Sequence, residues 1–225
     1  MKLSIIVPAL DEAAGIAAAL EALAPLRAVG HEVIVVDGGS ADATAAIAAP
    51  LADRVIRAPR GRARQMNAGA AIAAGDALLF LHADTRLPEH AAELVSGALE
   101  RCGWGRFDVR IEGRSQGLAV VAFCMNWRSR LTGIATGDQA MFIRRDVFVR
   151  AGGFPDIPLM EDIALSTRLK TISVPACVAA RAVTSGRRWE RRGVLRTVLL
   201  MWRLRLAYFF GARPEDLARR YANGA

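Results

Sequence analysis

With 225 residues, of which 53% are hydrophobic and 23% charged, the chain has the composition of a globular protein, which excludes an intrinsically disordered one. The net charge of +8 favours anionic partners such as phosphates or a membrane surface, although only Lys2 and Lys170 are lysines and 28 of the 30 basic residues are arginines, a bias typical of a GC-rich genome. The three cysteines are far apart and form no C-x-x-C pair, which argues against a zinc site or a disulfide framework.

The first predicted element is a short strand over residues 3–7, a continuous apolar run of the kind that is buried on both faces of a parallel sheet. It begins directly after Lys2 and is followed by Asp11 and Glu12, so it has neither the layout of a signal peptide nor the length of a membrane span. Together with the cysteine pattern, this predicts a cytoplasmic protein, with the inner face of the membrane as a further location.

The rest of the first half alternates between helix and strand patterns. Helices are predicted over residues 13–26, 42–49, 62–74 and 89–101, and strands over residues 31–36, 54–57 and 77–81. Short links between alternating strands and helices are typical of an α/β domain with a Rossmann-like, mostly parallel sheet flanked by helices.

The second half is less regular. Strands are predicted over residues 107–111 and 139–144, and helices over residues 116–131, 161–169 and 194–210. No repeat, low-complexity stretch or linker interrupts the chain, so residues 1–225 are expected to form a single domain.

Each of the first four predicted strands ends in a polar cluster. The clusters are Pro8-Ala9-Leu10-Asp11-Glu12, Asp37-Gly38-Gly39-Ser40, Arg60-Gly61-Arg62-Ala63-Arg64-Gln65 and His82-Ala83-Asp84. Each alone has a structural explanation as a tight turn, a helix N-cap or solvated surface. In open α/β sheets, however, ligands bind outside the carboxyl ends of the strands. Four clusters on the same edge therefore predict a ligand-binding site there.

Two nucleotide-binding classes that share this architecture do not fit the first cluster. A dinucleotide-binding dehydrogenase needs G-x-G-x-x-G directly after the first strand, where this chain has the segment beginning at Pro8. A sugar-nucleotidyltransferase would place a glycine-rich loop with a basic residue at the same position. The sequence contains no P-loop either.

An ordered series of motifs resembles the family 2 glycosyltransferases. The matching segments are Ser4-Ile5-Ile6-Val7-Pro8-Ala9-Leu10-Asp11-Glu12, Val35-Val36-Asp37-Gly38-Gly39-Ser40, Arg64-Gln65-Met66-Asn67-Ala68-Gly69, Phe80-Leu81-His82-Ala83-Asp84-Thr85, Gly137-Asp138-Gln139-Ala140-Met141-Phe142, Gly152-Gly153-Phe154 and Glu161-Asp162. The resemblance covers about residues 1–170 and implies a GT-A fold. The short length and the arginine-rich tail resemble a compact bacterial subgroup.

The resemblance also divides the single domain. Residues 1–112 would form the nucleotide-sugar-binding half, residues 113–190 the acceptor and catalytic half, and residues 191–225 an amphipathic helical tail. In the first half, Asp37 would hydrogen-bond the nucleobase, with Pro8, Glu12 and Gly39 in the same pocket. Asp11 stands where the family usually has asparagine, which leaves its contact open.

The phosphate side of the site is implied in the same way. Arg62 or Arg64 would approach the base or the diphosphate. Asp84 falls at the final aspartate of the family's D-x-D motif and would bind a divalent metal, Mg²⁺ or Mn²⁺, together with the substrate phosphates. The first acid of that motif is replaced by His82, which would contact the ribose or the metal.

Two acids open the predicted helix at residue 161. Acids are common at this position because the helix dipole favours them. The resemblance adds a catalytic role: Asp162 would act as general base on the acceptor hydroxyl, so that the reaction inverts the anomeric centre. Glu161 and Asp138 would line the acceptor side.

The segment Ser185-Gly186-Arg187-Arg188-Trp189 partly resembles the Q-x-x-R-W motif of processive family members. Because Ser185 replaces the glutamine, only two roles carry over. Arg188 would bind the diphosphate, and Trp189 would stack on the acceptor.

The predicted tail helix over residues 194–210 is apolar but contains arginines, and charges at this spacing make a membrane-spanning helix costly. On a helix, one side would carry the arginines Arg192, Arg196 and Arg203. The apolar residues Leu195, Val198, Trp202 and Phe209 would lie largely on the other side. The region over residues 191–210 could lie on anionic lipid, which would suit a lipid-linked acceptor. It could equally pack on the domain or on the partner in a homodimer.

The sequence thus predicts an inverting, metal-dependent glycosyltransferase that uses a nucleoside-diphosphate sugar, with UDP-sugars the commonest choice in the family. The alternative is a sugar-nucleotide-binding partner subunit without activity of its own, an interpretation motivated by His82. Nucleic acid is not expected as a partner, because no recognition motif accompanies the basic tail.

Overall fold

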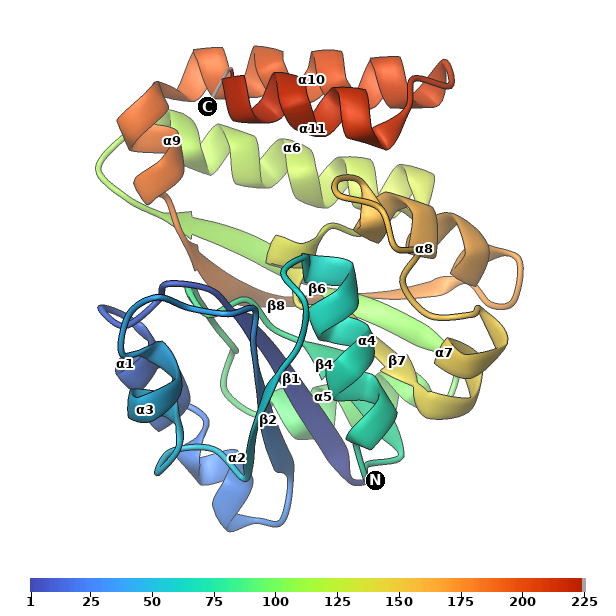
Figure 1. The fold of residues 1–225 in the computed structure, drawn as a ribbon. Helices are drawn as coiled ribbons and strands as arrows, with labels where there is room; N and C mark the ends of the chain where they lie inside the picture. The colour runs from blue at the N-terminus through green and yellow to red at the C-terminus, as the bar shows by residue number, and fades with distance from the viewer. Residues whose placement is uncertain (224–225) are drawn as a thin grey trace.

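The computed structural model describes residues 1–223, and of Arg188 and Asn223 it describes the backbone alone. Its helices alternate with strands through the first half and then gather at the end of the chain (Figure 1). The helices are α1 (Ile16–Glu21), α2 (Ala24–Ala28), α3 (Thr44–Ala48), α4 (Arg62–Ile72), α5 (Ala91–Leu99), α6 (Gly117–Thr132), α7 (Arg145–Arg150), α8 (Glu161–Lys170), α9 (Arg187–Arg192), α10 (Val194–Phe209) and α11 (Pro214–Asn223), with a 3₁₀ turn η1 (Gly137–Gln139).

The first half forms the parallel part of the sheet. Its strands are β1 (Leu3–Ala9), β2 (Glu32–Asp37), β3 (Arg54–Arg57) and β4 (Ala77–Phe80), in the spatial order β3-β2-β1-β4. Every residue of β1, β2 and β4 is buried, as expected for continuous apolar strands covered on both faces.

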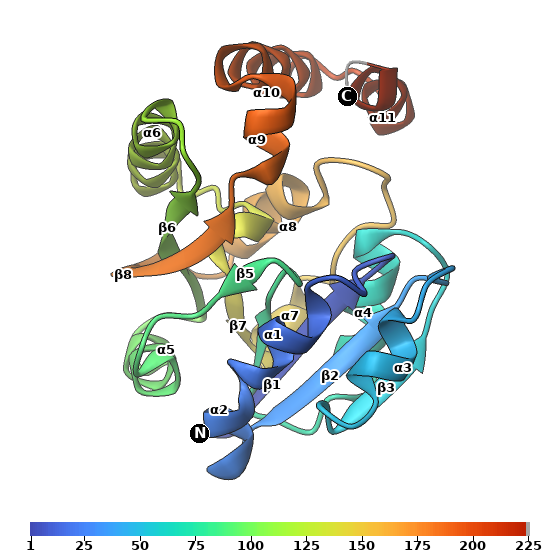
Figure 2. The same ribbon diagram turned by 90° about the vertical axis from the view of Figure 1, so that its left-hand side faces the viewer.

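The strands that follow β4 in the sequence extend this sheet beyond it. Next to β4 lies β7 (Phe142–Arg144), followed by β6 (Trp104–Glu112), β8 (Pro175–Ser185) and the short β5 (Thr85–Arg86). The pairings of β7 with β4 and β6 are antiparallel, β6 with β8 is parallel, and β5 with β8 is antiparallel. The sheet curls, so that β8 lies on the opposite side of the molecule from β3 (Figure 2). The predicted α/β class with a mostly parallel sheet is confirmed, and every antiparallel pair among the described strands involves β7 or β5.

Two apolar layers cover the faces of the sheet. Alternate residues of β1 belong to opposite layers, since Ile5 lies in the layer that contains Leu20 of α1 and Val95 of α5, whereas Ile6 lies in the layer that contains Met66 of α4 and Leu165 of α8. This alternation follows from the two-residue period of a strand. Helices from both halves of the chain therefore share one core.

Two predicted boundaries were wrong. The helix predicted over residues 13–26 is divided into α1 and α2, because Pro25 occupies the first turn of α2 and a proline starts a helix more readily than it continues one. The strand predicted over residues 139–144 begins only at Phe142, since residues 137–139 form the turn η1.

The last helices form a layer above α6 and α8 (Figure 1). Leu204 of α10 and Leu217 of α11 are buried against Leu159 and Met160, and Val198 packs on the cluster around Val109. Along α10, Leu195, Trp202 and Phe209 are exposed whereas Val198 faces the protein, and the division of this helix into an arginine side and an apolar side stays a prediction. Within residues 1–223, no helix has both the length and the apolar character required to cross a membrane.

Candidate active site

The loops that follow β1 and β2 are bound to each other. The buried carboxylate of Asp37, the last residue of β2, accepts hydrogen bonds from the backbone N–H groups of Gly39 and Ser40, both at 3.1 Å. The Asp11 N–H donates to the Ser40 hydroxyl at 3.0 Å, and the Asp11 carboxylate accepts from the Ala41 N–H at 2.8 Å. Asp11 has φ = 53°, in the left-handed region that aspartate and asparagine enter most readily among residues other than glycine. Its role here is to join the two loops.

The other predicted base-pocket residues lie at the same edge. The register of the sheet places Ala9 opposite Asp37 and the buried Pro8 opposite Val36, so Pro8 lies one residue before the partner of Asp37. The half-buried Glu12 donates its backbone N–H to the Thr44 hydroxyl at 2.8 Å. The structure thus brings Pro8, Glu12, Asp37 and Gly39 together, and their contact with a nucleobase stays a prediction.

Sequence analysis assigned no role to Gln65, which organises this edge. Its buried amide nitrogen donates to the Ala9 carbonyl at 2.9 Å and to the Val36 carbonyl at 2.8 Å, so one side chain joins the ends of β1 and β2. Two residues further on, Asn67 exchanges hydrogen bonds with the backbone of Phe154, at 2.8 and 3.0 Å. The signal was present, since both amides lie in a motif that carried the resemblance.

His82 follows β4 and contacts the turn η1. Its Nδ1 lies 3.3 Å from an Asp138 carboxylate oxygen, and its side chain is only 18% exposed. The ring packs directly on Gly137, where a Cβ atom would lie 2.4 Å from the His82 Nε2. Glycine is therefore required at position 137 for His82 to hold this orientation.

The acids at the start of α8 face the same turn. One oxygen of Asp162 accepts the Gly137 N–H at 3.0 Å, and the other accepts the Ile163 N–H at 2.7 Å. The preceding residue, the buried Met160, has φ = 70°, which is unusual for a bulky side chain. A small pocket at this point is lined by Met66, Phe80, His82, Gly137, Met141, Phe154, Glu161 and Asp162.

Arg62, the first residue of α4, lies next to these acids. Its Nε lies 3.6 Å from an oxygen of the buried Glu161. Burial acts to lower the pKa of Arg62, but the charges of Glu161, Asp162 and Asp138 outweigh it and raise the pKa. Burial raises the pKa of Glu161, the charge of Asp162 raises it further, and Arg62 only partly offsets the two. Arg62 therefore links the first half of the chain to the acids of the second.

Asp84 lies at the outer end of the site. Its side chain is exposed and lies 3.5 Å from the Thr85 hydroxyl. Its carbonyl accepts the Ser185 N–H at 3.2 Å, which attaches this loop to β8. Within residues 1–223, no group of three or more His, Cys, Asp or Glu side chains is arranged to hold a metal ion.

Three predicted site residues are not brought into this group. Arg64 is exposed and pairs with Asp156 at 2.8 Å, a hydrogen bond that raises the pKa of Arg64. Trp189 packs beside Val194 and lines a separate hollow next to Arg114. The backbone of Arg188 lies in α9, and its side chain falls outside the described residues. The roles of these three residues stay predictions.

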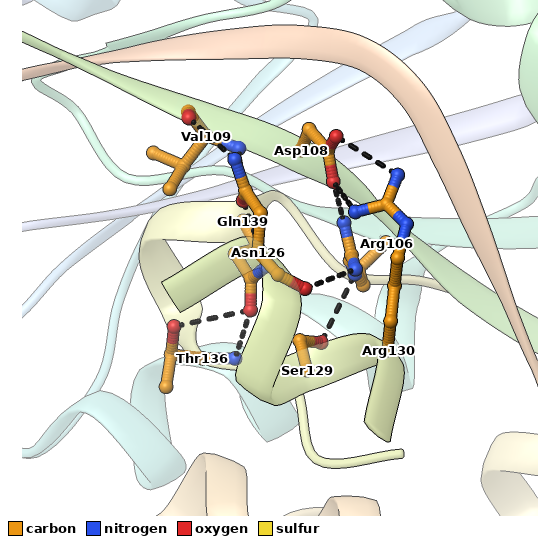
Figure 3. Close-up of polar contacts among 8 residues, drawn as sticks. All are labelled: Arg106, Asp108, Val109, Asn126, Ser129, Arg130, Thr136 and Gln139. Carbon is orange, nitrogen blue, oxygen red and sulfur yellow. Dashed lines mark hydrogen bonds and ion pairs between the residues drawn. The ribbon is translucent and has the colours of Figure 1, made fainter. Parts of the chain in front are cut away.

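A buried polar network connects β6 and α6 to the turn η1 (Figure 3). Arg106 of β6 is completely buried and donates to the Ser129 hydroxyl at 3.0 Å, to the Asn126 carbonyl at 3.2 Å and to Asp108. Asn126 also exchanges hydrogen bonds with the Val109 backbone, at 2.8 and 3.0 Å.

The network reaches the site through Gln139. Its amide nitrogen lies 3.5 Å from the Asn126 Oδ1, and its amide oxygen accepts from the Thr136 N–H at 3.2 Å. Residues 137 and 138 thus lie between this network and His82, whose Nδ1 is 3.3 Å from Asp138.

Fold and site together define an α/β protein of the GT-A class, with an acid-lined site at the carboxyl ends of its parallel strands. The chain belongs to glycosyl transferase family 2, whose family model matches residues 4–147. A comparison with curated protein sequences gives no match.

Solved structures share the fold. Residues 1–349 of S. aureus TarS give a TM-score of 0.65 at 19% identity, covering 88% of this chain and 64% of that chain. The same TarS fragment in complex with UDP-GlcNAc gives 0.65 at 20% identity, covering 82% of this chain and 58% of that one. Glucosyl-3-phosphoglycerate synthase from Mycobacterium tuberculosis, in complex with Mn²⁺, UDP and glucosyl-3-phosphoglycerate, gives 0.59 at 22% identity, covering 81% and 71%. The chain spans less than two thirds of the length of these TarS structures.

Proposed function

We propose that the protein is an inverting glycosyltransferase that moves a sugar from a nucleoside-diphosphate sugar, a UDP-sugar in the first instance, to a hydroxyl of an acceptor. One observation carries the proposal: Asp162 is fixed by the Gly137 N–H in a pocket that it shares with His82, next to the strand ends that hold Asp37. The solved complexes of TarS with UDP-GlcNAc and of the mycobacterial synthase with UDP support the choice of donor.

In the proposed reaction, the Asp162 carboxylate takes the proton of the acceptor hydroxyl. The acceptor oxygen then forms a bond to the anomeric carbon from the side opposite the diphosphate. The bond between that carbon and the diphosphate oxygen breaks, and its electron pair leaves with the diphosphate, which inverts the anomeric centre. Arg62 holds Glu161 next to this base and adds positive charge on the side of the leaving diphosphate.

Asp84 is the residue proposed to bind a divalent metal. Its exposed carboxylate fits a cation that takes most of its ligands from substrate phosphates, as Mg²⁺ usually does. A bound cation would neutralise charge on the departing diphosphate. The mycobacterial synthase structures contain UDP with Mn²⁺ or Mg²⁺, which supports both metals as candidates.

The experiment is to incubate the protein with labelled nucleotide sugars and MgCl₂ or MnCl₂, and to measure release of the nucleoside diphosphate. Asp162→Asn should lower turnover by about 10²-fold or more, as expected for loss of a general base, and should leave the affinity for UDP unchanged. Asp146→Asn on α7 is the control, because Asp146 is exposed and pairs with Arg144 at 2.9 Å. Metal-dependent binding without turnover would instead identify a sugar-nucleotide-binding partner subunit.

We also propose that the protein docks on anionic membranes through an outer apolar face. This face is made of large exposed side chains at helical spacing on two neighbouring helices, α6 and α10. Its residues are Val120, Phe123, Trp127 and Leu131 of α6, and Leu195, Leu199, Trp202, Leu206 and Phe209 of α10. The exposed Arg196 and Arg203 lie among them, and basic residues beside an apolar helical face favour anionic lipid surfaces. A lipid-linked acceptor would suit such a location.

A further inference from the structure

Two arginines occupy the space where the last helices meet the site. Arg128 lies on α6, Arg205 lies on α10, and the two helices contact each other. Figure 1 shows α10 above α6, with α8 beside α6. Neither arginine was assigned a role from the sequence motifs.

Among the described residues, the buried nitrogens of these two guanidinium groups lack hydrogen-bond partners. They are the Nε and Nη2 of Arg128 and the Nε of Arg205. Arg106, on the other side of α6, shows how a buried arginine is normally accommodated, since Ser129, Asn126 and Asp108 accept from it. Buried polar groups are nearly always paired, and an exception needs an explanation.

The electrostatics of the two groups agree with their geometry. Burial lowers the pKa of Arg128 to about 10, and the positive charge of Arg205 contributes to this. Burial likewise lowers the pKa of Arg205. Two positive charges are therefore held close together in a partly dehydrated place, which an anion would stabilise.

Packing places the pair next to the start of α8, because Leu204, which precedes Arg205, is buried in one cluster with Met160, two residues before Asp162. Asp162 acts on both arginines, and Asp138 acts on Arg205 as well. The proposed function gives Asp162 the acceptor hydroxyl, and the family resemblance implies an acceptor-side position for Asp138, whereas the base pocket lies at the ends of β1 and β2. An anionic acceptor would be repelled by the acids, and the arginine pair would offset that repulsion.

We propose that Arg128 and Arg205 bind an anionic group of the acceptor, a phosphate or a carboxylate, and so orient its hydroxyl toward Asp162. The planar guanidinium presents parallel N–H donors that match such oxyanions. This inference rests on the proposed function for its identification of the acceptor side.

The experiment measures binding of inorganic phosphate by calorimetry, at constant ionic strength, to protein saturated with UDP and MgCl₂. Arg128→Gln and Arg205→Gln should each weaken phosphate binding by about 10-fold, the usual order for a charged hydrogen-bonding partner, and the double variant should abolish it. Arg150→Gln is the control, since Arg150 is exposed on α7 and this variant should bind phosphate as the unaltered protein does.

A titration of UDP separates this site from the donor site. The affinity for UDP should be the same in Arg128→Gln, Arg205→Gln and the unaltered protein. An equal loss of UDP affinity would assign the pair to the donor diphosphate and overturn the proposal, as would phosphate binding that neither substitution weakens. If UDP does not bind at all, the proposed function fails, and the phosphate titration without UDP still tests the arginine pair.

A thermal melt separates binding from a structural role. Because the buried nitrogens have no partners to lose, the two glutamine variants should unfold at the same temperature as the unaltered protein or higher. A lower unfolding temperature together with unchanged phosphate binding would show that the two arginines support the fold instead.

Discussion

At the scale of single residues, the site depends on close contacts with backbone groups more than on long side chains. Gly137 illustrates this, since its N–H holds Asp162 while its missing side chain leaves room for the ring of His82. The carboxylate of Asp37 is likewise occupied by backbone N–H groups of its own turn. Small changes at such positions should therefore affect activity more than stability.

Gly137→Ala tests this expectation. The new Cβ would lie 2.4 Å from the His82 Nε2, so the ring must move and its contact with Asp138 must change. We expect turnover to fall by about 10-fold or more, with the free energy of unfolding lowered by only about 1 kcal/mol, because a ring at a half-buried edge can shift. Steady-state kinetics and urea denaturation measure the two effects.

Gly97→Ala is the control for that substitution. Gly97 lies within α5, and no other side chain or neighbouring element comes within 4 Å of the place that a Cβ atom would take. Alanine should therefore stabilise the protein by about 0.5–1 kcal/mol and leave turnover unchanged. Full activity of Gly137→Ala would show that the orientation of His82 is irrelevant to the reaction.

Arg106 is the second residue-scale test. Arg106→Met leaves the buried polar groups of Ser129 and Asn126 without their donor, and should lower the free energy of unfolding by about 3–5 kcal/mol. Arg110→Met on the same strand removes an exposed pair with Glu112 at 3.8 Å and should cost about 0–1 kcal/mol. Urea denaturation compares them, and equal costs would contradict a supporting role for the buried network.

At the scale of elements, side chains outside the strands fix how strands and helices meet. Asp53, just before β3, accepts the Val33 N–H of β2 at 2.7 Å and pairs with Arg27 of α2 at 3.0 Å. Partial burial acts to raise the pKa of Asp53, but the hydrogen bond from Arg27 and that from Val33 outweigh it, so the pKa is lowered from 3.8. A carboxylate with a lowered pKa stabilises the fold above its unfolded-state pKa and loses this effect as the pH falls.

Asp53→Asn should accordingly lower the free energy of unfolding by about 1 kcal/mol at pH 7, a modest value because the side chain is partly solvated. The difference from the unaltered protein should shrink as the pH falls through 3.8 and below, where the native aspartate becomes protonated as well. Urea denaturation at a series of pH values follows this. A difference that stays constant over the whole range would rule out the carboxylate charge as its source.

The elements of the first half could be predicted from the sequence because each strand is a short apolar run bounded by polar residues, glycine or proline. Strands β1 and β2 are continuous runs of buried residues that end at Ala9 and Asp37, next to the polar clusters. In contrast, β8 was missed, because its small residues alternate between half-buried and exposed positions and carry no strong apolar pattern. Its place in the sheet is set by pairing with β6, which is distant in sequence.

Some residues of the candidate site could likewise be predicted from the sequence, and others could not. The clusters at the strand ends were found because the architecture places them on one edge, and Asp162 was found through a motif. Gln65 lay in a motif of the family but received no role, whereas the buried Arg106 and the incompletely paired Arg128 and Arg205 could not be found, because an isolated arginine carries no local signal. Only the packing of α6 and α10 against the core distinguishes the paired arginine from the unpaired ones.

At the scale of the whole molecule, the C-terminal layer gives one side of the protein an apolar exterior. The outer apolar face spans α6 and α10, and its tryptophans, Trp127 and Trp202, are 51% and 69% exposed. Because α10 also carries Arg205 on its inner side, the proposed membrane surface and the proposed acceptor subsite share one helix.

Trp202→Glu should weaken binding to vesicles containing phosphatidylglycerol by about 10-fold or more, since it replaces apolar contact area by a charge that anionic lipid repels. Val149→Glu is the control, because Val149 is 70% exposed but lies on α7. Flotation with vesicles of anionic or neutral lipid measures binding, and sedimentation velocity measures oligomeric state. A dimer that Trp202→Glu dissociates, without binding to vesicles, would assign the face to a second copy of the chain.

The late position of β8 has a consequence for the order of assembly. The pairs of β1 with β2 and β4 need only the first part of the chain, whereas β6 pairs along its whole length with β8, from Trp104 with Pro175 to Glu112 with Ser185. During synthesis, the β6 edge therefore stays open until about seventy further residues have emerged, and an open edge invites pairing with other chains. Nascent chains stalled between these strands would be the form of this protein most in need of a chaperone.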